Sequence, residues 1–326
     1  AIGLAVGIMI LLWVQDEFSY DNFHENAGRI YRINSHLGTG NDGGIWDGSP
    51  GPLATYSKQS IPEVVSAVRV NKIPEEILFK YEDKKFTERN AAFVDASFFS
   101  VFDFPLVQGD KNNPFPNVNS AVISSSVAKK YFGKANPIGK ILVNENGNFI
   151  VSGVTKDFPA NSTLYFDVLL PMPFYADLFA KGGGNGDWKT IDTDLGNYSF
   201  YTFLQLRSDA SPKIVEEKIT KIYQDKRKGD APGVFFTIQP LKTLHLIAAD
   251  KTATVLQTAR IFFIASLLIL LIACINYVNL STARAMLRSK EVSVRKIIGA
   301  QKFQLFMQFI IETALLFMFA AMLSLV

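Results

Sequence analysis

Residues that commonly build catalytic and metal sites are scarce in this chain. Its 326 residues include 1 cysteine and 3 histidines. Cys274 therefore has no partner for an intrachain disulfide, and we expect it to be a small apolar packing residue. The histidines, His24, His36 and His245, lack the spacing of metal ligands, so we expect no metal site.

Sequence motifs of known catalytic chemistry are also missing. No phosphate-binding loop of the form G-x-x-x-x-G-K-S/T occurs, since the glycine-rich stretch 182–186 lacks the lysine. The hydrolase, zinc-protease and dithiol motifs G-x-S-x-G, H-E-x-x-H and C-x-x-C are absent as well. We therefore expect that this chain is not an enzyme, holds no cofactor and does not hydrolyse ATP.

The sequence also lacks a large excess of charge of one sign. Lys and Arg number 33 and Asp and Glu number 30, for a net charge of +3. No strong global field follows, so the sequence does not imply a nucleic-acid partner. Charged residues make up 19% and hydrophobic residues 48%, and the mean hydropathy is +0.15. This composition excludes a disordered chain and argues against a purely soluble enzyme.

Long apolar runs account for this hydropathy. At about 1.5 Å per residue, about 20 helical residues cross the roughly 30 Å hydrocarbon core of a bilayer. We predict transmembrane helices over residues 1–18, 258–281 and 303–326. The first is too short to cross and is interpreted as the second part of a longer helix, and the third is interpreted as cut off at its end. Gly3 and Gly7 have the small-xxx-small spacing that lets a second helix approach, although ordinary helix packing explains them equally well.

Positive charge gathers between the second and third apolar runs. Six cations lie there: Arg284, Arg288, Lys290, Arg295, Lys296 and Lys302. With the single anion Glu291 they give the segment a net charge of +5. The positive-inside rule then places residues 282–302 in the cytoplasm and residues 19–257 on the opposite side of the membrane.

The extracytoplasmic segment 19–257 has the pattern of an α+β domain. Strand–helix–strand signals occur near both of its ends, at residues 29–36, 52–60 and 64–71 and again at 199–207, 211–226 and 234–239. We predict that the two units together form one α+β subdomain and that a second α/β subdomain is inserted between them in the sequence.

Polar residues occur within the predicted spans, and three of them are candidates for a specific role there. Asn276 and Asn279 are interpreted as interhelical hydrogen bonders rather than ligands. Glu312, about nine residues into the third run, is either a functional carboxylate or a group near the cytoplasmic interface that bonds a neighbouring helix. We favour the second interpretation.

The basic segment carries the most informative motif. Apolar residues alternate with its cations, which predicts an amphipathic helical link that stops at Gly299. Contact with lipid headgroups is one interpretation of such a link. Residues 290–300, KEVSVRKIIGA, also resemble the signature of MacB/FtsX-like ABC transporter permeases, with Ser293 where a Gly is common.

The middle of the chain is similar to the MacB-type periplasmic core domain. The matching stretches are Phe98-Phe99, Phe102–Phe104, Ser124, Tyr131–Gly133, Pro137–Gly139 and Val151–Val154. Two earlier stretches, DEFSYD at 16–21 and RIYR at 29–32, resemble permeases of this group from Bacteroidetes-type bacteria.

The resemblance implies a permease subunit that works with a separate ATPase, in which Mg-ATP is bound. The link would form a coupling helix that docks on the ATPase. The matching residues are Glu291, Val292, Val294, Arg295, Lys296, Ile297 and Gly299. Arg295 and Lys296 would supply charge complementarity, and Val294 and Ile297 would fill an apolar groove. Members of the family pair two permease halves, and most have a fourth helix, so this chain resembles a fragment.

Three functions remain open at this point. The first is mechanotransmission for export or extraction of an amphiphile such as a peptide, antibiotic or lipoprotein, with a periplasmic adaptor as a further partner. The second is an FtsX-like regulator that activates a cell-wall hydrolase. The third and weakest is a membrane-bound sensor, because no signalling module is visible in the sequence.

Overall fold

The computed structural model describes residues 2–38, 44–287, 294, 297 and 301–324. The chain folds into two compact units. One combines Ala1–Ser19 with Ala253–Val326, and the other is Tyr20–Thr252. We call them the helical unit and the folded unit and describe each by itself.

Among the described residues, the helical unit contains the helices α1 (Ile2–Glu17), α7 (Thr254–Leu287) and α9 (Lys302–Ser324). Among the described residues, one stretch, Thr254–Arg284 within α7, is long and apolar enough to cross a membrane by length and composition. It contains the predicted second span. The predictions that α1 and α9 also span stay predictions.

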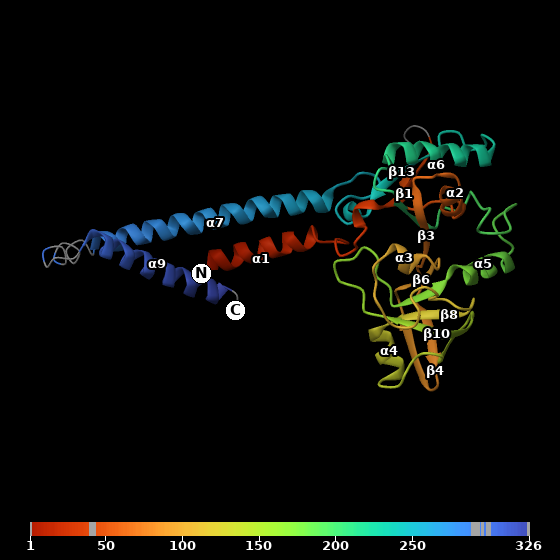
Figure 1. Cartoon of the computed structure of the whole chain (residues 1–326), viewed down its shortest axis with the longest axis horizontal. Helices are drawn as coiled ribbons and strands as arrows, with labels where there is room; N and C mark the ends of the chain where they lie inside the picture. Colours follow the sequence, from red (N-terminus) through yellow and green to blue (C-terminus); the bar gives the residue numbers. More distant parts are fainter. Residues whose placement is uncertain (1, 39–43, 288–293, 295–296, 298–300, 325–326) are drawn as a thin grey trace. The chain divides into compact units, whose positions relative to one another are not determined.

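The two ends of the folded unit form the predicted strand–helix–strand units. The first consists of β1 (Ile30–Leu37), α2 (Pro52–Ser60) and β3 (Val64–Ile73), and the second of β12 (Tyr201–Leu206), α6 (Pro212–Arg227) and β13 (Phe235–Pro240). Their strands lie in the order β13–β1–β12–β3, and all neighbours are antiparallel. Figure 1 shows α2 and α6 alongside these strands.

Side-chain alternation makes the two faces of these four strands different. Ile33, Leu204 and Ile238 point toward α2 and α6 and belong to one buried cluster with Val215 and Ile219. The opposite face carries Ile30, Phe203 and Val68, which belong to a second cluster. Neither α2 nor α6 packs against this second face. The candidate site described below lies on it.

Local signals explain where several helices begin and end. Ser124 Oγ accepts a hydrogen bond from the Val127 backbone N–H at 3.2 Å, and α4 (Ser125–Phe132) stops at Gly133, whose φ is 63°. The sequence Ser211-Pro212 has the pattern of a helix start, and α6 does begin at Pro212, but Ser211 makes no capping side-chain hydrogen bond.

The inserted segment does not form a sheet of its own. Its elements are β4 (Ile77–Tyr81), β5 (Lys84–Glu88), β6 (Ala91–Val94), α3 (Phe98–Val101), β7 (Leu106–Gln108), β8 (Ser120–Ser124), β9 (Ile141–Asn144), β10 (Gly147–Thr155), β11 (Val168–Pro171) and α5 (Met172–Lys181). A further short strand, β2 (Gly44–Trp46), lies between β1 and α2 and pairs with β1. The pairing continues from β3 through β6, β11, β8, β10, β9 and β4 to β5. This continuity arises because β3 runs on to Ile73 and pairs its last four residues with β6.

Phenylalanine side chains fill the centre of the folded unit. Phe98, Phe99, Phe102 and Phe104 are each at most 1% exposed, and Phe158 and Phe166 pack with them. Such rings bury large apolar areas and prefer tilted or edge-on contacts, which the observed pairs have in most cases. The motif that carried the family resemblance is therefore also a core motif.

Candidate functional site

The chain enters the folded unit through a buried aspartate. Asp21 is 1% exposed and has a φ of 55°. Its carboxylate accepts hydrogen bonds from Thr163 Oγ1 at 2.6 Å, from the Thr163 N–H at 3.0 Å and from Ser162 Oγ at 3.1 Å. Burial raises the pKa of Asp21, and the Thr163 and Ser162 hydrogen bonds oppose that rise. Asp21 thus fastens the start of the folded unit to residues 161–163.

His24 anchors the same segment in the aromatic core. Its ring is 5.0 Å from Phe104 and 5.4 Å from Phe102, centroid to centroid. The Asp103 N–H donates to His24 Nδ1 at 3.0 Å, and His24 Nε2 has no hydrogen-bond partner among the described residues. Burial lowers the pKa of His24 to about 4, and Asp103 opposes the shift. The imidazole is therefore neutral at physiological pH.

The chain leaves the folded unit at the same place. After β13, Leu241 is fully buried in the same cluster as Ala27 and Ile30 of the entering segment. Tyr20 and His245 stack with ring centroids 3.4 Å apart. The entering segment (residues 20–29) and the leaving segment (residues 241–252) are therefore joined to one another and to one core. We call this junction the base of the folded unit.

The helical unit contains a close helix contact at the predicted glycines. A Cβ added at Gly3 would lie 3.2 Å from Ala273 Cβ, and one added at Gly7 would lie 2.7 Å from Leu270 Cδ2. α1 and α7 therefore approach each other closely at both glycines, as this spacing allows. Asn276 lines a cavity of about 440 Å³ beside Gly3.

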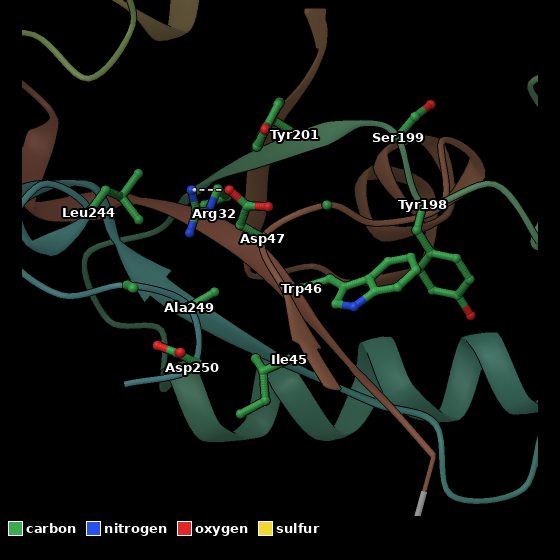
Figure 2. A pocket seen from close by; sticks show the side chains of 12 residues that line it. Arg32, Ile45, Trp46, Asp47, Tyr198, Ser199, Tyr201, Leu244, Ala249 and Asp250 are labelled. Carbon is green, nitrogen blue, oxygen red and sulfur yellow. Dashed lines mark ion pairs between the residues drawn. The ribbon is translucent and has the colours of Figure 1, made fainter. Parts of the chain in front are cut away.

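A polar cavity in the folded unit lies beside the leaving segment. It measures about 530 Å³ and is formed by β1, β2 and the residues after it, the start of β12 with the residues before it, and the leaving segment. Its lining residues are Arg32, Ile45, Trp46, Asp47, Gly48, Tyr198, Ser199, Tyr201, Leu244, Ala248, Ala249 and Asp250. Figure 2 shows Arg32 and Asp47 facing each other, with Trp46 and Tyr198 together on one side. We call this cavity the Arg32 pocket.

Hydrogen bonds connect the floor of the Arg32 pocket to the leaving segment. Arg32 Nε donates to Asn34 Oδ1 at 3.1 Å, and Asn34 Nδ2 donates to Gln239 Oε1 at 2.9 Å. Gln239 Nε2 in turn donates to the Ile247 carbonyl at 2.8 Å. All three side chains lie on the face of β1 and β13 that is opposite to α2 and α6, because alternate residues of a strand share a side.

Few of the sequence-predicted site residues can be placed. Glu291, Val292, Arg295, Lys296 and Gly299 lie outside the described residues. Val294 and Ile297 have helical backbone and expose 53% and 84% of their surface. Their proposed insertion into a partner stays a prediction.

The polar residues of the predicted spans lie in different settings. Asn276 and Asn279 are both exposed on α7, and of these two only Asn276 is among the residues that line the cavity beside Gly3. Glu312 is half-buried on α9. Among the described residues, no group of three or more His, Cys, Asp and Glu side chains is placed to hold a metal ion.

Sequence reasoning did not identify the Arg32 pocket. Arg32 and Asp47 come from one end of the folded unit, and Tyr201 and Gln239 come from the other. One signal was available: Arg32 shares a strand face with the core residue Ile30, and a charged residue on an inward face needs a partner. Its partners are known only once the two ends are paired.

Comparisons with known proteins agree with this architecture. The family model of the MacB-like periplasmic core domain matches residues 1–222, and that of the FtsX-like permease C-terminal region matches residues 263–326. A domain of a permease from Porphyromonas gingivalis has the same fold, with a TM-score of 0.54 and 20% sequence identity over 67% of this chain and 92% of that domain.

Similar curated proteins are longer than this chain. The macrolide export ATP-binding/permease protein MacB of Aggregatibacter actinomycetemcomitans is 26% identical over 80% of this chain and 38% of its own length. The uncharacterized ABC transporter permease YknZ of Bacillus subtilis is 24% identical over 60% of this chain and 44% of its own length. The chain thus spans less than half the length of each of these relatives. Because the two family models together cover most of it, the chain belongs to the MacB/FtsX-like family of ABC transporter permeases and carries a MacB-like periplasmic core domain.

Proposed function

We propose that this chain is a mechanotransmission subunit, in which ATP hydrolysis by a separate ATPase moves the folded unit on the far side of the inner membrane. The movement would serve export or extraction of an amphiphile such as a peptide, an antibiotic or a lipoprotein. The observation that carries this proposal is the base of the folded unit, where the entering and leaving segments are joined.

The strands that follow from the base support a mechanical role. β1 and β13 are antiparallel neighbours over six residue pairs, from Tyr31 with Pro240 to His36 with Phe235. Both strands then share the buried cluster that includes Ile33 and Phe236. A displacement that arrives through either segment is therefore shared by both strands, because hydrogen bonds and packing hold them together.

The proposal needs partners that this chain does not contain. An ATPase subunit would bind Mg-ATP and contact the link through Glu291, Val292, Val294, Arg295, Lys296, Ile297 and Gly299. A second permease half, either a second copy or another repeat of a longer chain, would complete the membrane region, and a periplasmic adaptor is a further partner. The alternative is an FtsX-like regulator of a cell-wall hydrolase. Co-purification of an adaptor favours export, whereas co-purification of a hydrolase favours regulation.

The coupling role is tested by reversing charge in the link. The double variant Arg295→Glu/Lys296→Glu should abolish stimulation of the partner ATPase in reconstituted vesicles, because both cations are proposed to complement the ATPase surface. Insertion into the membrane should be unchanged. Arg288→Glu/Lys302→Glu is a matched control, since it reverses two charges of the same link outside the core of the motif. Unchanged stimulation by the first variant would refute the coupling role.

A further inference from the structure

The Arg32 pocket contains a buried cation that its surroundings pair incompletely. Arg32 exposes only 9% of its surface. Its Nη1 atom is 3.6 Å from Asp47 Oδ2, which is an ion-pair distance but too long for a strong hydrogen bond. Its Nη2 atom donates to Gln239 Oε1 at 3.4 Å, which is also long. A buried guanidinium normally requires close charged partners.

A second arginine in the same sheet shows what complete pairing looks like. Arg69 on β3 is also 9% exposed. It makes a bidentate contact with Asp95, at 3.0 Å from Nε and 2.9 Å from Nη2, and its Nη1 donates to Asp192 at 2.6 Å. These carboxylates raise the pKa of Arg69, whereas burial lowers the pKa of Arg32 and Asp47 only partly opposes it. At equal burial, Arg32 therefore lacks one anion.

The remaining walls of the pocket add hydrogen-bonding and apolar surface. Tyr201 contributes a hydroxyl, and burial raises its pKa, so this group stays protonated and can donate. Trp46 is 53% exposed and meets Tyr198 edge-on at 6.0 Å, and Ile45 and Leu244 add further apolar surface to the lining. The volume of about 530 Å³ is within the range of small-molecule sites.

We propose that the Arg32 pocket binds a small amphiphilic carboxylate. The carboxylate would lie on the Nη1 side of Arg32 within reach of the Tyr201 hydroxyl, and the apolar body would lie against Ile45 and Trp46. Asp47, whose side chain is 50% exposed and accepts no hydrogen bond from the described residues, would turn toward solvent. Bidentate carboxylate recognition is the geometry for which a guanidinium is suited.

The assignment of an anion rather than a cation has a physical reason. Asp47 and Asp250 line the pocket and could attract an ammonium group instead. Both are solvent-accessible, however, and Asp250 already accepts the Thr252 N–H at 2.8 Å. A charge that is hydrated gains less from a ligand than one that is buried and incompletely paired, so Arg32 dominates recognition.

Binding can be measured on the full chain in detergent micelles or lipid nanodiscs by calorimetry. The probes are octanoate and N-acetyl-Leu-Phe, each compared with its neutral amide. Both acids carry the proposed chemistry, but one stands for an acyl chain and the other for a peptide C-terminus. We expect at least one acid to bind about ten times more tightly than its amide, and the acid that does so identifies the source.

Variants test the geometry without relying on the buried arginine alone. Asp47→Asn removes the competing anion and should tighten carboxylate binding about threefold or more. Trp46→Ala and Arg32→Lys should each weaken it about tenfold, and Trp46 and Asp47 are exposed enough for their variants to fold. Asp209→Asn is the matched control, because it removes a carboxylate from an exposed Arg–Asp pair, that with Arg207, outside the pocket. Equal binding of acid and amide, weaker acid binding by Asp47→Asn, or binding of octylamine that Asp47→Asn abolishes would each overturn the proposal.

Discussion

At the scale of single residues, His24 makes the stability of the folded unit depend on pH. The pKa of this buried imidazole is lowered to about 4 from an ordinary value of 6.5. Between these values the unfolded chain binds a proton that the folded chain does not. Above pH 6.5, His24 therefore does not make the free energy of unfolding depend on pH. As the pH falls from 6.5 to 4, protonation of His24 in the unfolded chain lowers the free energy of unfolding by about 3 kcal/mol.

The variant His24→Gln should remove this pH dependence. Glutamine does not titrate, and its amide oxygen can replace Nδ1 as acceptor of the Asp103 N–H. Urea unfolding of the full chain in detergent, followed by tryptophan fluorescence, should show a steeper loss of stability in the unchanged protein than in the variant between pH 6.5 and 4. Parallel curves for the two proteins would contradict the role assigned to His24.

Residue types predicted some features of the site and missed others. Gly3 and Gly7 were identified from spacing alone, because helical geometry fixes which residues share a face. The Arg32 pocket could not be predicted, because Arg32 and Gln239 are 207 positions apart and meet only through the pairing of β1 with β13. The coupling residues were identified by resemblance, and Val294 and Ile297 are the two that the structure describes.

At the scale of elements, boundaries with a local physical cause were predicted closely. α2 covers Pro52–Ser60, the range predicted from the sequence, and α4 has local signals at both ends, the Ser124 cap and the positive φ of Gly133. β11 (Val168–Pro171) and α3 (Phe98–Val101) were not predicted, since each is only four residues long and too short to display a period. In the glycine-rich stretch 182–186, Asn185 forms an isolated β-bridge with Trp188, a contact that no local sequence pattern indicates.

The contact between α1 and α7 yields a prediction at this scale. Gly3→Val should lower the thermal unfolding temperature of the helical unit, because the new Cβ would meet Ala273 Cβ, which cannot rotate away. Overpacking of this kind costs about 1–3 kcal/mol. Gly7→Ala should cost less, because the obstructing atoms belong to the end of the Leu270 side chain.

Thermal unfolding of detergent-solubilised protein, followed by helical circular dichroism, measures this effect. Met9→Phe is the control, since it enlarges an exposed side chain on the same helix. If Met9→Phe and Gly3→Val lowered the unfolding temperature equally, the close approach at Gly3 would not contribute to packing.

At the scale of the whole molecule, the placement of charge predicts which regions face the cytoplasm. The chain has one cysteine, Cys274, so a Cys274→Ser background can carry single reporter thiols. Lys111→Cys, at an exposed position of the folded unit, should react with a membrane-impermeant maleimide in intact spheroplasts. Ala300→Cys in the basic link should react only after lysis, because the positive-inside rule places it in the cytoplasm.

The reverse labelling pattern would contradict the topology and, with it, the proposed coupling to an ATPase. Sequence alone was sufficient for this prediction because apolar length and charge position are local properties. The sequence was not sufficient to predict the arrangement of the sheet. There, β3 pairs with β12 on one side and with β6 on the other, and so joins the strand–helix–strand units to the inserted segment. Pairings between distant segments depend on three-dimensional packing that no local pattern records.

The neighbouring positions of β1 and β13 have an evolutionary consequence. Since Tyr31 lies opposite Pro240, the start of β1 and the end of β13 lie side by side. A unit with adjacent termini can be exchanged for a homologous one without lengthening either connection. Recombination between relatives could therefore replace the folded unit while the helical unit stays the same.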